Sequence, residues 1–189
     1  NWENKQNQVI LKNNDGPPIT IENLTDLESP PDMIYITKNQ IIDNEGNQVE
    51  FNDTSYHGCD CTNCYENRDQ CCSAIMGFTC FYNNKGILAR ETDIIFECNS
   101  KCKCDIDCPN RVVQKGRKLK LGVFRTENGT RGWGVKTLEP IPKGSFVMEY
   151  VGELISLSAA DDRPRTYLFD LESRIDANDV DYTYVIGMF

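Results

Sequence analysis

The distribution of apolar residues predicts that the C-terminal part of the chain is built from β-strands. From about residue 109, apolar and polar positions alternate with a period of two, and Gly, Pro, Asp and Asn separate the alternating segments. Little of the chain shows the periodicity of a helix. We therefore expect strands within five segments, residues 119–125, 133–138, 145–155, 166–171 and 182–186.

The longest of these segments, residues 145–155, carries apolar side chains on both faces of the predicted strand. Phe146, Met148 and Tyr150 share one face, whereas Val147 and Val151 share the other. Because a strand that is apolar on both sides is normally buried on both sides, we expect other elements to cover each face at least in part.

The first 58 residues are predicted to wrap around other parts of the protein with little core of their own. Polar stretches dominate this segment, and only residues 19–21 and 33–37 form short extended candidates, each preceded by a pair of prolines. Residues 59–108 also hold few apolar residues for their length. Something other than a hydrophobic interior must therefore fold this second segment.

The cysteines of residues 59–108 indicate that metal binding folds this segment. An odd number of cysteines cannot pair completely into disulfides, whereas a zinc ion takes four ligands and thiolates can be shared between ions. Nine sulfurs supply the twelve ligand positions of three zinc ions if three of them bridge, and the cluster then has a net charge of minus three. Binding free energies of about 10–16 kcal/mol per structural zinc would suffice for folding. The nine cysteines fall in two short runs, Cys59, Cys61, Cys64, Cys71 and Cys72, then Cys98, Cys102, Cys104 and Cys108.

The competing interpretation is a secreted domain held together by disulfides. The ten cysteines and three Asn-x-Thr sequons, at Asn23, Asn52 and Asn128, support it. Adjacent Cys71 and Cys72 oppose it, because near neighbours cannot easily bond to each other. We therefore favour zinc-bound thiolates in a reducing, intracellular compartment.

Two further residues with metal-binding chemistry stand outside the count of nine. Cys80 lies among the aromatic residues Phe78, Phe81 and Tyr82, and we expect a buried or half-buried free thiol there. His57 is the only histidine and directly precedes the first cysteine run. A tenth zinc ligand is the alternative for His57, but nine sulfurs already balance the cluster, so we expect a plain loop residue.

The charge of the chain restricts the partners that it can bind. The formal net charge of −9 and the sequence pI near 4.7 argue against binding nucleic acid mainly through phosphate contacts, and no sequence-specific nucleic-acid binding is expected. An acidic surface suits a basic partner, although solubility alone would also account for it. The short basic run at residues 111–120 is expected to be a solvated approach to a strand.

Nothing in the sequence indicates membrane insertion. No run of 18 apolar residues occurs, and the first residues lack a hydrophobic signal segment. The chain begins at Asn1 without an initiator methionine, so we expect it to be a piece of a longer protein.

Several motifs in a fixed order resemble one protein family. These are the cysteine pattern and four segments after it, residues 109–116 (PNRVVQKG), 131–135 (RGWGV), 149–153 (EYVGE) and 166–171 (TYLFDL). Over residues 19–171 the chain is similar to histone-lysine methyltransferases of the suppressor-of-variegation type. The resemblance implies a mainly β fold with an irregular zinc-cluster region. Its domains would be a wrapping segment at residues 1–58, a trinuclear pre-SET zinc module at 59–108 and the N-terminal part of a SET domain at 109–189.

The resemblance also implies a reaction and its participants. S-adenosylmethionine would be the methyl donor, lysine 9 in the N-terminal tail of histone H3 the acceptor, and the nine cysteines the ligands of three zinc ions. Chromatin proteins would be further partners, and the location would be chromatin in the nucleus, where the enzyme serves heterochromatin formation and gene silencing.

The resemblance assigns roles to five residues near the reaction. Gly132, Trp133 and Gly134 match a stretch that touches the cofactor, where glycines let the backbone approach a ligand closely; a tight β-turn with a core tryptophan is the alternative. Tyr167 matches another cofactor-contacting position, although it could be an ordinary strand tyrosine. Tyr150 matches a tyrosine of the lysine channel, and its hydroxyl would orient the neutral amine for in-line attack; core packing is the alternative.

The chain departs from the family pattern in two places. Only twelve residues separate Glu153 from Thr166, fewer than in the helical insert usual for the family. After residue 171 the match is poor, and the family's later Asn-His-Ser-Cys and Phe-Asp-Tyr segments and post-SET cysteines are missing. We therefore expect these 189 residues alone to be inactive, and a non-catalytic zinc-binding module for chromatin interactions is the alternative function.

Overall fold

The computed structural model describes residues 1–50, 57–127, 131–170 and 182–186. The chain forms two compact units. Unit 1 comprises Asn1–Asn52, Val123–Val135 and Tyr150–Phe189, and unit 2 comprises Asp53–Gly122 and Lys136–Glu149. The domain boundaries expected after residues 58 and 108 stay a prediction, and the sequons at Asn52 and Asn128 lie outside the described residues.

A three-stranded sheet with the order β1-β4-β5 carries one of the motifs singled out in the sequence. It consists of β1 (Thr20–Glu22), β4 (Leu121–Arg125) and β5 (Trp133–Thr137). Thr126 N donates to Gly132 O and Leu138 N donates to Lys120 O, so β4 and β5 run antiparallel. The strands expected within residues 119–125 and 133–138 are confirmed, and β1 overlaps the extended candidate at residues 19–21.

The N-terminal helix α1 (Trp2–Asn13) was not expected from the sequence. Asn1 caps its first turn by accepting a hydrogen bond from Asn4 N, and Asn14 ends it in the left-handed conformation at φ 53°. Only Gln6 and Ile10 are buried, so the apolar pattern is too sparse to show a helical period.

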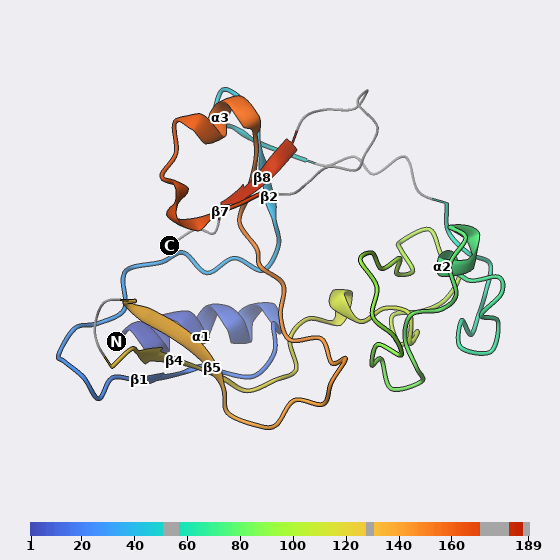
Figure 1. Cartoon of the computed structure of the whole chain (residues 1–189), viewed down its shortest axis with the longest axis horizontal. Coiled ribbons are helices and arrows are strands. Elements are labelled where there is room, and N and C mark those ends of the chain that lie inside the picture. Colours follow the sequence, from blue (N-terminus) through green and yellow to red (C-terminus); the bar gives the residue numbers. More distant parts are fainter. Residues whose placement is uncertain (51–56, 128–130, 171–181, 187–189) are drawn as a thin grey trace. The chain divides into compact units, whose positions relative to one another are not determined.

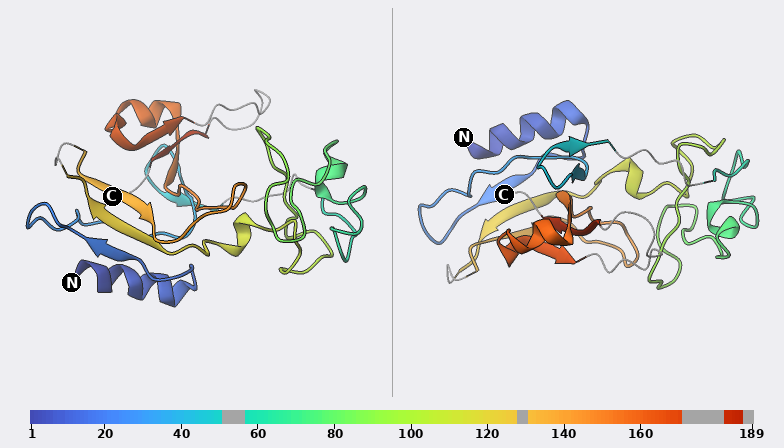
Figure 2. Two further views of the ribbon diagram at one scale, coloured as in Figure 1. Left: turned by 60° about the horizontal axis from the view of Figure 1, so that its bottom comes forward. Right: turned by 90° about the horizontal axis from the view of Figure 1, so that it is seen from above.

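Polar side chains attach α1 to β1, which lies beside it in both views of Figure 2. Asn7 Nδ2 donates to Ile19 O (2.9 Å), and Ile19 N donates back to Asn7 Oδ1 (2.8 Å). Ile21 N donates to the Glu3 carboxylate at 3.0 Å. Residues 1–22 are thus held together mainly by polar contacts, and the wrapping segment expected at residues 1–58 stays a prediction.

A second sheet of five strands has the order β3-β2-β6-β8-β7. β2 and β6 are parallel, and the other neighbouring pairs are antiparallel. Helix α3 (Leu157–Asp161) follows β6 and contacts β6 and β8, with Ile42, Ile155 and Ala160 forming the small core. The strands are β2 (Gln40–Ile42), β3 (Gln48–Val49), β6 (Glu153–Ser156), β7 (Leu168–Asp170) and β8 (Tyr182–Ile186).

The prediction of one long strand at residues 145–155 is wrong for most of these residues. Regular strand structure begins only at Glu153, and among the described residues no strand pairs with residues 145–152. Val147, Met148 and Tyr150 are 40%, 49% and 50% exposed, and Phe146 and Val151 are half-buried, so both groups of side chains are covered only in part. An alternating pattern marks residues that can be buried on a sheet, but a strand forms only where a neighbour accepts its backbone hydrogen bonds.

The structure also differs from a regular strand at one extended candidate and at part of one expected strand. Residues 33–37 form no strand; Gln6 instead donates to Met33 O, and Tyr35 donates to Asp15. Residues 166–171 begin with the end of a 3₁₀ turn (Arg165–Tyr167) before β7, and Leu171 lies outside the described residues. The strand expected at residues 182–186 is confirmed as β8.

Unit 2 has little regular structure (Figure 1). Besides the ends of β4 and β5, its described residues form the short helix α2 (Cys72–Ile75), the 3₁₀ turn η1 (Val113–Lys115) and a β-bridge between Tyr82 and Leu88. Cysteines make up most of its interior, beside a buried Phe81. The expected fold class, mainly β with an irregular cysteine-rich region, is confirmed, and among the described residues no helix is long and apolar enough to cross a bilayer.

Candidate functional site

All nine cysteines predicted as metal ligands lie in one cluster. Eight of them are buried and Cys102 is partly buried. The close approach of the chain segments depends on Gly58, because a Cβ there would collide with the backbone of Lys101. The sequence therefore brings the two cysteine runs together as expected.

Three sulfurs form the centre of this cluster. The Sγ atoms of Cys59, Cys64 and Cys98 are separated by 3.7 Å (59–64), 3.8 Å (59–98) and 3.5 Å (64–98). These distances are far beyond an S–S bond of about 2.05 Å, and all ten cysteines are free thiols in the structure. The arrangement therefore disagrees with the disulfide alternative.

Four of the six other ligand candidates join this triangle in sets that could each hold a metal ion, whereas Cys71 and Cys72 belong to none of these sets. In each set the sulfur atoms lie within 4.8 Å of one another. Cys72 Sγ is in addition 3.2 Å from Cys102 Sγ. Because every set combines cysteines of the triangle with cysteines outside it, the donor arrangement fits metal ions that share thiolates. The sets are Cys59-Cys61-Cys64, Cys59-Cys98-Cys102-Cys104 and Cys64-Cys98-Cys104-Cys108.

Burial makes thiolates unfavourable in this cluster unless positive charge compensates for it. Burial is the largest contribution that raises the pKa of Cys61, to about 11, and it also raises the pKa values of Cys64 and Cys98. Divalent cations would reverse this effect, because they stabilise the deprotonated sulfur. A buried cluster of so many thiols thus suits bound metal.

Nitrogen donors also surround the sulfurs. Asn110 is fully buried, and its Nδ2 donates to Cys98 Sγ at 3.4 Å while its backbone N donates to Cys108 Sγ at 3.4 Å. The backbone N atoms of Cys59 and Asn99 donate to Cys102 Sγ at 3.4 Å and 3.2 Å. Such donors delocalise thiolate charge and orient the ligands.

The expectation that the basic run at residues 111–120 is solvated is wrong for its first residue, Arg111. Its side chain is buried, and Nη2 donates to Asn99 O (2.7 Å), Cys104 O (3.2 Å) and Cys104 Sγ (3.7 Å). Burial opposes its charge, but the bond to Cys104 and the charges of nearby sulfurs outweigh this and raise the pKa of Arg111.

Cys80 and His57 lie outside the metal-binding sets of the described residues. Cys80 is half-buried, as expected, but it packs against the cluster, and its hydrogen bond to Cys71 is the main cause that lowers the pKa of Cys71 to about 5. His57 is exposed, and its carbonyl accepts a hydrogen bond from Asn99 Nδ2.

The predicted cofactor segment lies at the turn between β4 and β5. Gly132 has φ 68°, and its carbonyl accepts hydrogen bonds from Thr126 N and Thr126 Oγ1, both at 3.0 Å. A Cβ at Gly134 would stand 2.9 Å from the ring of Phe124, so glycine is required there for packing. Trp133 is half-buried rather than a core residue. The turn accounts for Gly132 and packing against Phe124 accounts for Gly134, and the cofactor contact stays a prediction.

Tyr150 and Tyr167 are brought together in unit 1. Tyr150 Oη donates to the backbone carbonyl of Tyr167 at 3.0 Å, and the Tyr150 ring centroid is 6.0 Å from that of Phe169. Tyr150 and Tyr167 are 50% and 45% exposed, which disagrees with the core-packing alternative for Tyr150. A phenol that donates in this way keeps its oxygen lone pairs as acceptors.

Family models match most of the chain. A Pre-SET motif matches residues 11–111, and a SET domain matches residues 132–187. Histone-lysine N-methyltransferase SUV39H2 of Xenopus tropicalis is 43% identical over 189 residues, 95% of this chain and 44% of that protein. SUV39H1 of Xenopus laevis is 45% identical over 172 residues, 86% of this chain and 39% of that protein. The chain thus spans less than half the length of these curated relatives.

Solved structures of related enzymes share the fold. Arabidopsis thaliana SUVH6 in complex with SAM matches with a TM-score of 0.72 and 34% identity over 90% of this chain and 37% of that one. KRYPTONITE in complex with mCHH DNA, an H3(1-15) peptide and SAH has a TM-score of 0.68 and 28% identity over 89% of this chain and 33% of that one. Neurospora DIM-5, a histone lysine methyltransferase, has a TM-score of 0.70 and 32% identity over 90% of this chain and 74% of that one.

The cysteine cluster, the SET-type strands and these matches agree with the resemblance found in the motifs. The chain belongs to the pre-SET and SET family of suppressor-of-variegation-type histone-lysine methyltransferases.

Proposed function

We propose that this chain is the zinc-binding and donor-side part of a histone H3 lysine-9 methyltransferase that uses S-adenosylmethionine. The observation that carries the proposal is the nine-sulfur cluster followed by the SET-domain match at residues 132–187. The SAM bound to SUVH6 and the H3(1-15) peptide bound to KRYPTONITE support the donor and the acceptor. A chromatin location in the nucleus and chromatin proteins as further partners follow from the same relationship.

The cluster would hold three zinc ions with Cys59, Cys64 and Cys98 as bridges. The mutual sulfur distances of 3.5–3.8 Å support this assignment, because each bridging sulfur must lie near the other two. Each ion would then take two bridging sulfurs and one terminal pair. Cys72 and Cys102, whose sulfurs lie 3.2 Å apart, would form one terminal pair, and Cys104 and Cys108, which share a set with two bridging sulfurs, would form another. Cys61 and Cys71 would then remain as the third pair.

Zinc in this cluster would serve folding rather than the reaction. Nine thiolates leave no ligand position for substrate, and a closed four-ligand site is typical of structural zinc. S-adenosylmethionine, when bound, supplies a methyl group on a sulfonium sulfur.

Positioning would account for most of the catalysis by this chain's own residues. The acceptor amine must be neutral and in line with the bond that breaks. Because Tyr150 Oη already donates to Tyr167 O, it would accept a hydrogen bond from an amine N–H and so direct the nitrogen lone pair. Tyr167 and the segment Gly132–Gly134 would contact the donor.

The alternative is a non-catalytic zinc-binding module for chromatin interactions. The half-exposed Tyr150 and Phe169 favour it, since residues that line a closed active site are normally covered. Under this alternative, and equally if the rest of the SET domain is required, the 189 residues would give little or no methyl transfer.

Zinc content tests the cluster directly. We expect close to three zinc ions per chain by elemental analysis under reducing conditions, and the same ratio for Cys80→Ser, which removes the one thiol outside the nine. Cys98→Ser would remove a bridge and lower the ratio by at least about one. A metal-free protein with oxidised cysteines would overturn the zinc assignment.

Titration calorimetry with S-adenosylmethionine separates the enzyme from the module. Measurable affinity supports a working donor site in this chain, whereas absence of binding supports the alternative. A methyl-transfer assay on an H3 tail peptide should give turnover near background, and turnover comparable to that of a complete enzyme would contradict the expected inactivity.

A further inference from the structure

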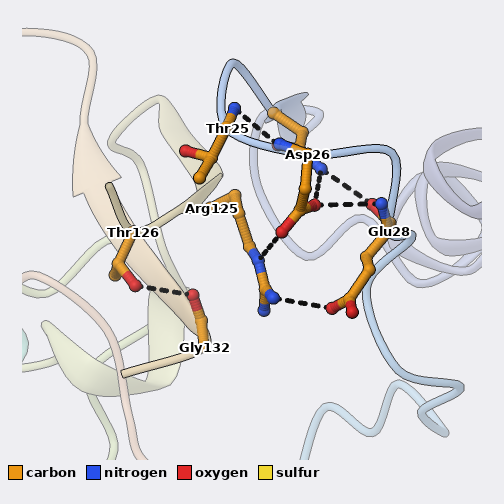
Figure 3. A network of polar contacts seen from close by, with 7 residues as sticks. Thr25, Asp26, Glu28, Arg125, Thr126 and Gly132 are labelled. Atoms are coloured by element: carbon orange, nitrogen blue, oxygen red, sulfur yellow. Dashed lines mark hydrogen bonds and ion pairs between the residues drawn. The ribbon is translucent and has the colours of Figure 1, made fainter. Parts of the chain in front are cut away.

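Arg125, the last residue of β4, forms two ion pairs with the N-terminal segment. Its Nε lies 2.8 Å from Asp26 Oδ2, and its Nη2 lies 2.6 Å from Glu28 Oε2. Figure 3 shows the guanidinium pointing at both carboxylates. The partners are 99 and 97 residues away in sequence, and the Arg125 side chain is only 11% exposed. These three residues are called the Arg125 network below.

Hydrogen bonds within the loop orient the Asp26 carboxylate that pairs with Arg125. Asn23 Oδ1 accepts from Thr25 N (3.0 Å) and Asp26 N (3.1 Å), and Asn23 Nδ2 donates to Asp26 Oδ1 at 2.8 Å. Glu28 N donates to Asp26 Oδ1 at 2.9 Å. Hydrogen bonds from Asn23 and from the Glu28 backbone, together with Arg125, lower the pKa of Asp26, so its carboxylate is charged at neutral pH. The loop is thus preorganised to bind a cation.

Apolar packing contributes little to this loop. Leu24 and Leu27 are 89% and 103% exposed, although they are its largest apolar side chains. With its leucines in solvent, the loop, which directly follows β1 of the same sheet, is held against the end of β4 by the ion pairs of Arg125. The specific position of the loop therefore has an electrostatic cause, and a partly buried pair of this kind is screened less than a surface pair.

On its other side Arg125 contacts the predicted donor segment. The guanidinium carbon lies 5.7 Å from the centroid of the Trp133 ring, within the range of a cation–π contact. The next residue, Thr126, holds the Gly132 carbonyl with two hydrogen bonds. Arg125 therefore stands between the N-terminal loop and the turn that carries Trp133.

We propose that Arg125 is a positioning residue that fixes Trp133, and that Asp26 and Glu28 of the N-terminal segment hold Arg125 for this purpose. The step from a fixed Trp133 to binding of the methyl donor rests on the proposed function. Lysine cannot replace Arg125, because one ammonium group does not reproduce the fork that reaches two carboxylates while a flat face lies near the indole.

Tryptophan fluorescence tests the first step without any ligand. In a Trp2→Phe background Trp133 is the only tryptophan. Arg125→Met should raise the acrylamide quenching constant of Trp133 roughly twofold, because the ring loses its covering cation, and Arg125→Lys should restore little of the protection. The Asp26→Asn/Glu28→Gln double variant keeps side-chain size and should increase quenching in the same direction.

Arg163→Met is the matched control, because Arg163 pairs with Glu153 in the same unit at 3.4 Å. It should leave Trp133 quenching unchanged. If Arg125→Met fails to fold, as judged by circular dichroism and zinc content, the double variant decides the question. Quenching constants equal to the parent in every folded variant of the network would overturn the proposal.

Calorimetric titration of the same proteins with S-adenosylmethionine tests the second step. If the parent binds, Arg125→Met should weaken binding by roughly tenfold, with Arg163→Met unchanged. If the network variants change Trp133 quenching but the parent does not bind S-adenosylmethionine, the positioning of Trp133 by Arg125 is supported and the proposed donor site of this chain is refuted. If binding occurs and is unaffected by a variant that exposes Trp133, the positioning role in donor binding fails while the proposed function stands.

Discussion

At the scale of single residues, Arg111 is the main addition to what the cysteine pattern predicts. Three zinc ions and nine thiolates would carry a net charge of minus three, and a buried guanidinium beside Cys104 offsets one unit of it. The same side chain ties Asn99 O and Cys104 O together, so it also connects the backbone of the second cysteine run. Charge compensation and loop closure would thus be combined in one residue.

We expect Arg111→Met to release zinc to a chelator faster than the parent, on the order of 10–100-fold, because residues that support ligands have effects of this size. Arg111→Lys should give an intermediate rate, since it keeps the charge without the fork. Release can be followed with a colorimetric zinc indicator. Lys118→Met, an exposed position of the same basic run, is the control, and equal rates for both variants would refute the role of Arg111.

At the scale of elements, the sequence predicted strands best where two neighbouring segments are close in the chain. β4 and β5 alternate clearly, and their pairing needs only the short turn that ends at Gly132. Residues 145–151 alternate as clearly, yet they form no regular strand, and β6 begins only at Glu153. Helix α1 was not predicted, because the side-chain amide of Asn7 and not an apolar stripe attaches it to Ile19.

The site was predictable to a different extent in its two parts. The nine clustered cysteines could be identified from the sequence by counting, because closely spaced cysteines have few roles other than metal binding. Arg111 and Asn110 could not, since their burial depends on where the second cysteine run folds. The Arg125 network joins segments nearly a hundred residues apart, and no local pattern marks it.

Asn7→Ala should lower the free energy of unfolding by about 1–3 kcal/mol, because it leaves the buried Ile19 backbone without both of its partners. Urea unfolding of the zinc-loaded chain measures this difference. Asn13→Ala, which removes only an exposed bond to Val9 O within α1, should change it by less than about 0.5 kcal/mol. Equal effects would show that α1 is not attached through Asn7.

At the scale of the whole molecule, the two units rely on different interactions. Unit 2 has cysteines where a domain of its size would have aliphatic side chains, whereas unit 1 contains the small core of Ile42, Ile155 and Ala160 and the helix α1 with Ile10 buried. Removing metal should therefore affect the units unequally.

After zinc removal by a chelator under reducing conditions, we expect peptides from residues 59–116 to lose most of their protection from hydrogen exchange. Peptides from α1 and β6 should lose much less, since their cores contain no cysteine. Mass spectrometry of the exchanged peptides measures both, and readdition of zinc is the control. Unchanged protection of the cysteine-rich peptides would show that metal is not what folds them.

The parallel pairing of β2 with β6 has a consequence for how the protein is made. Gly152 N donates to the side chain of Asn39, 113 residues earlier, and Gln40 pairs with Glu153. During synthesis on the ribosome, β2 can therefore pair with β6 only after residue 153 has emerged. The nine clustered cysteines all lie between residues 59 and 108, so they can bind metal earlier. Until β6 has emerged, the early strands of the nascent chain have an open edge, and chaperones that shield such edges would be needed most at this stage.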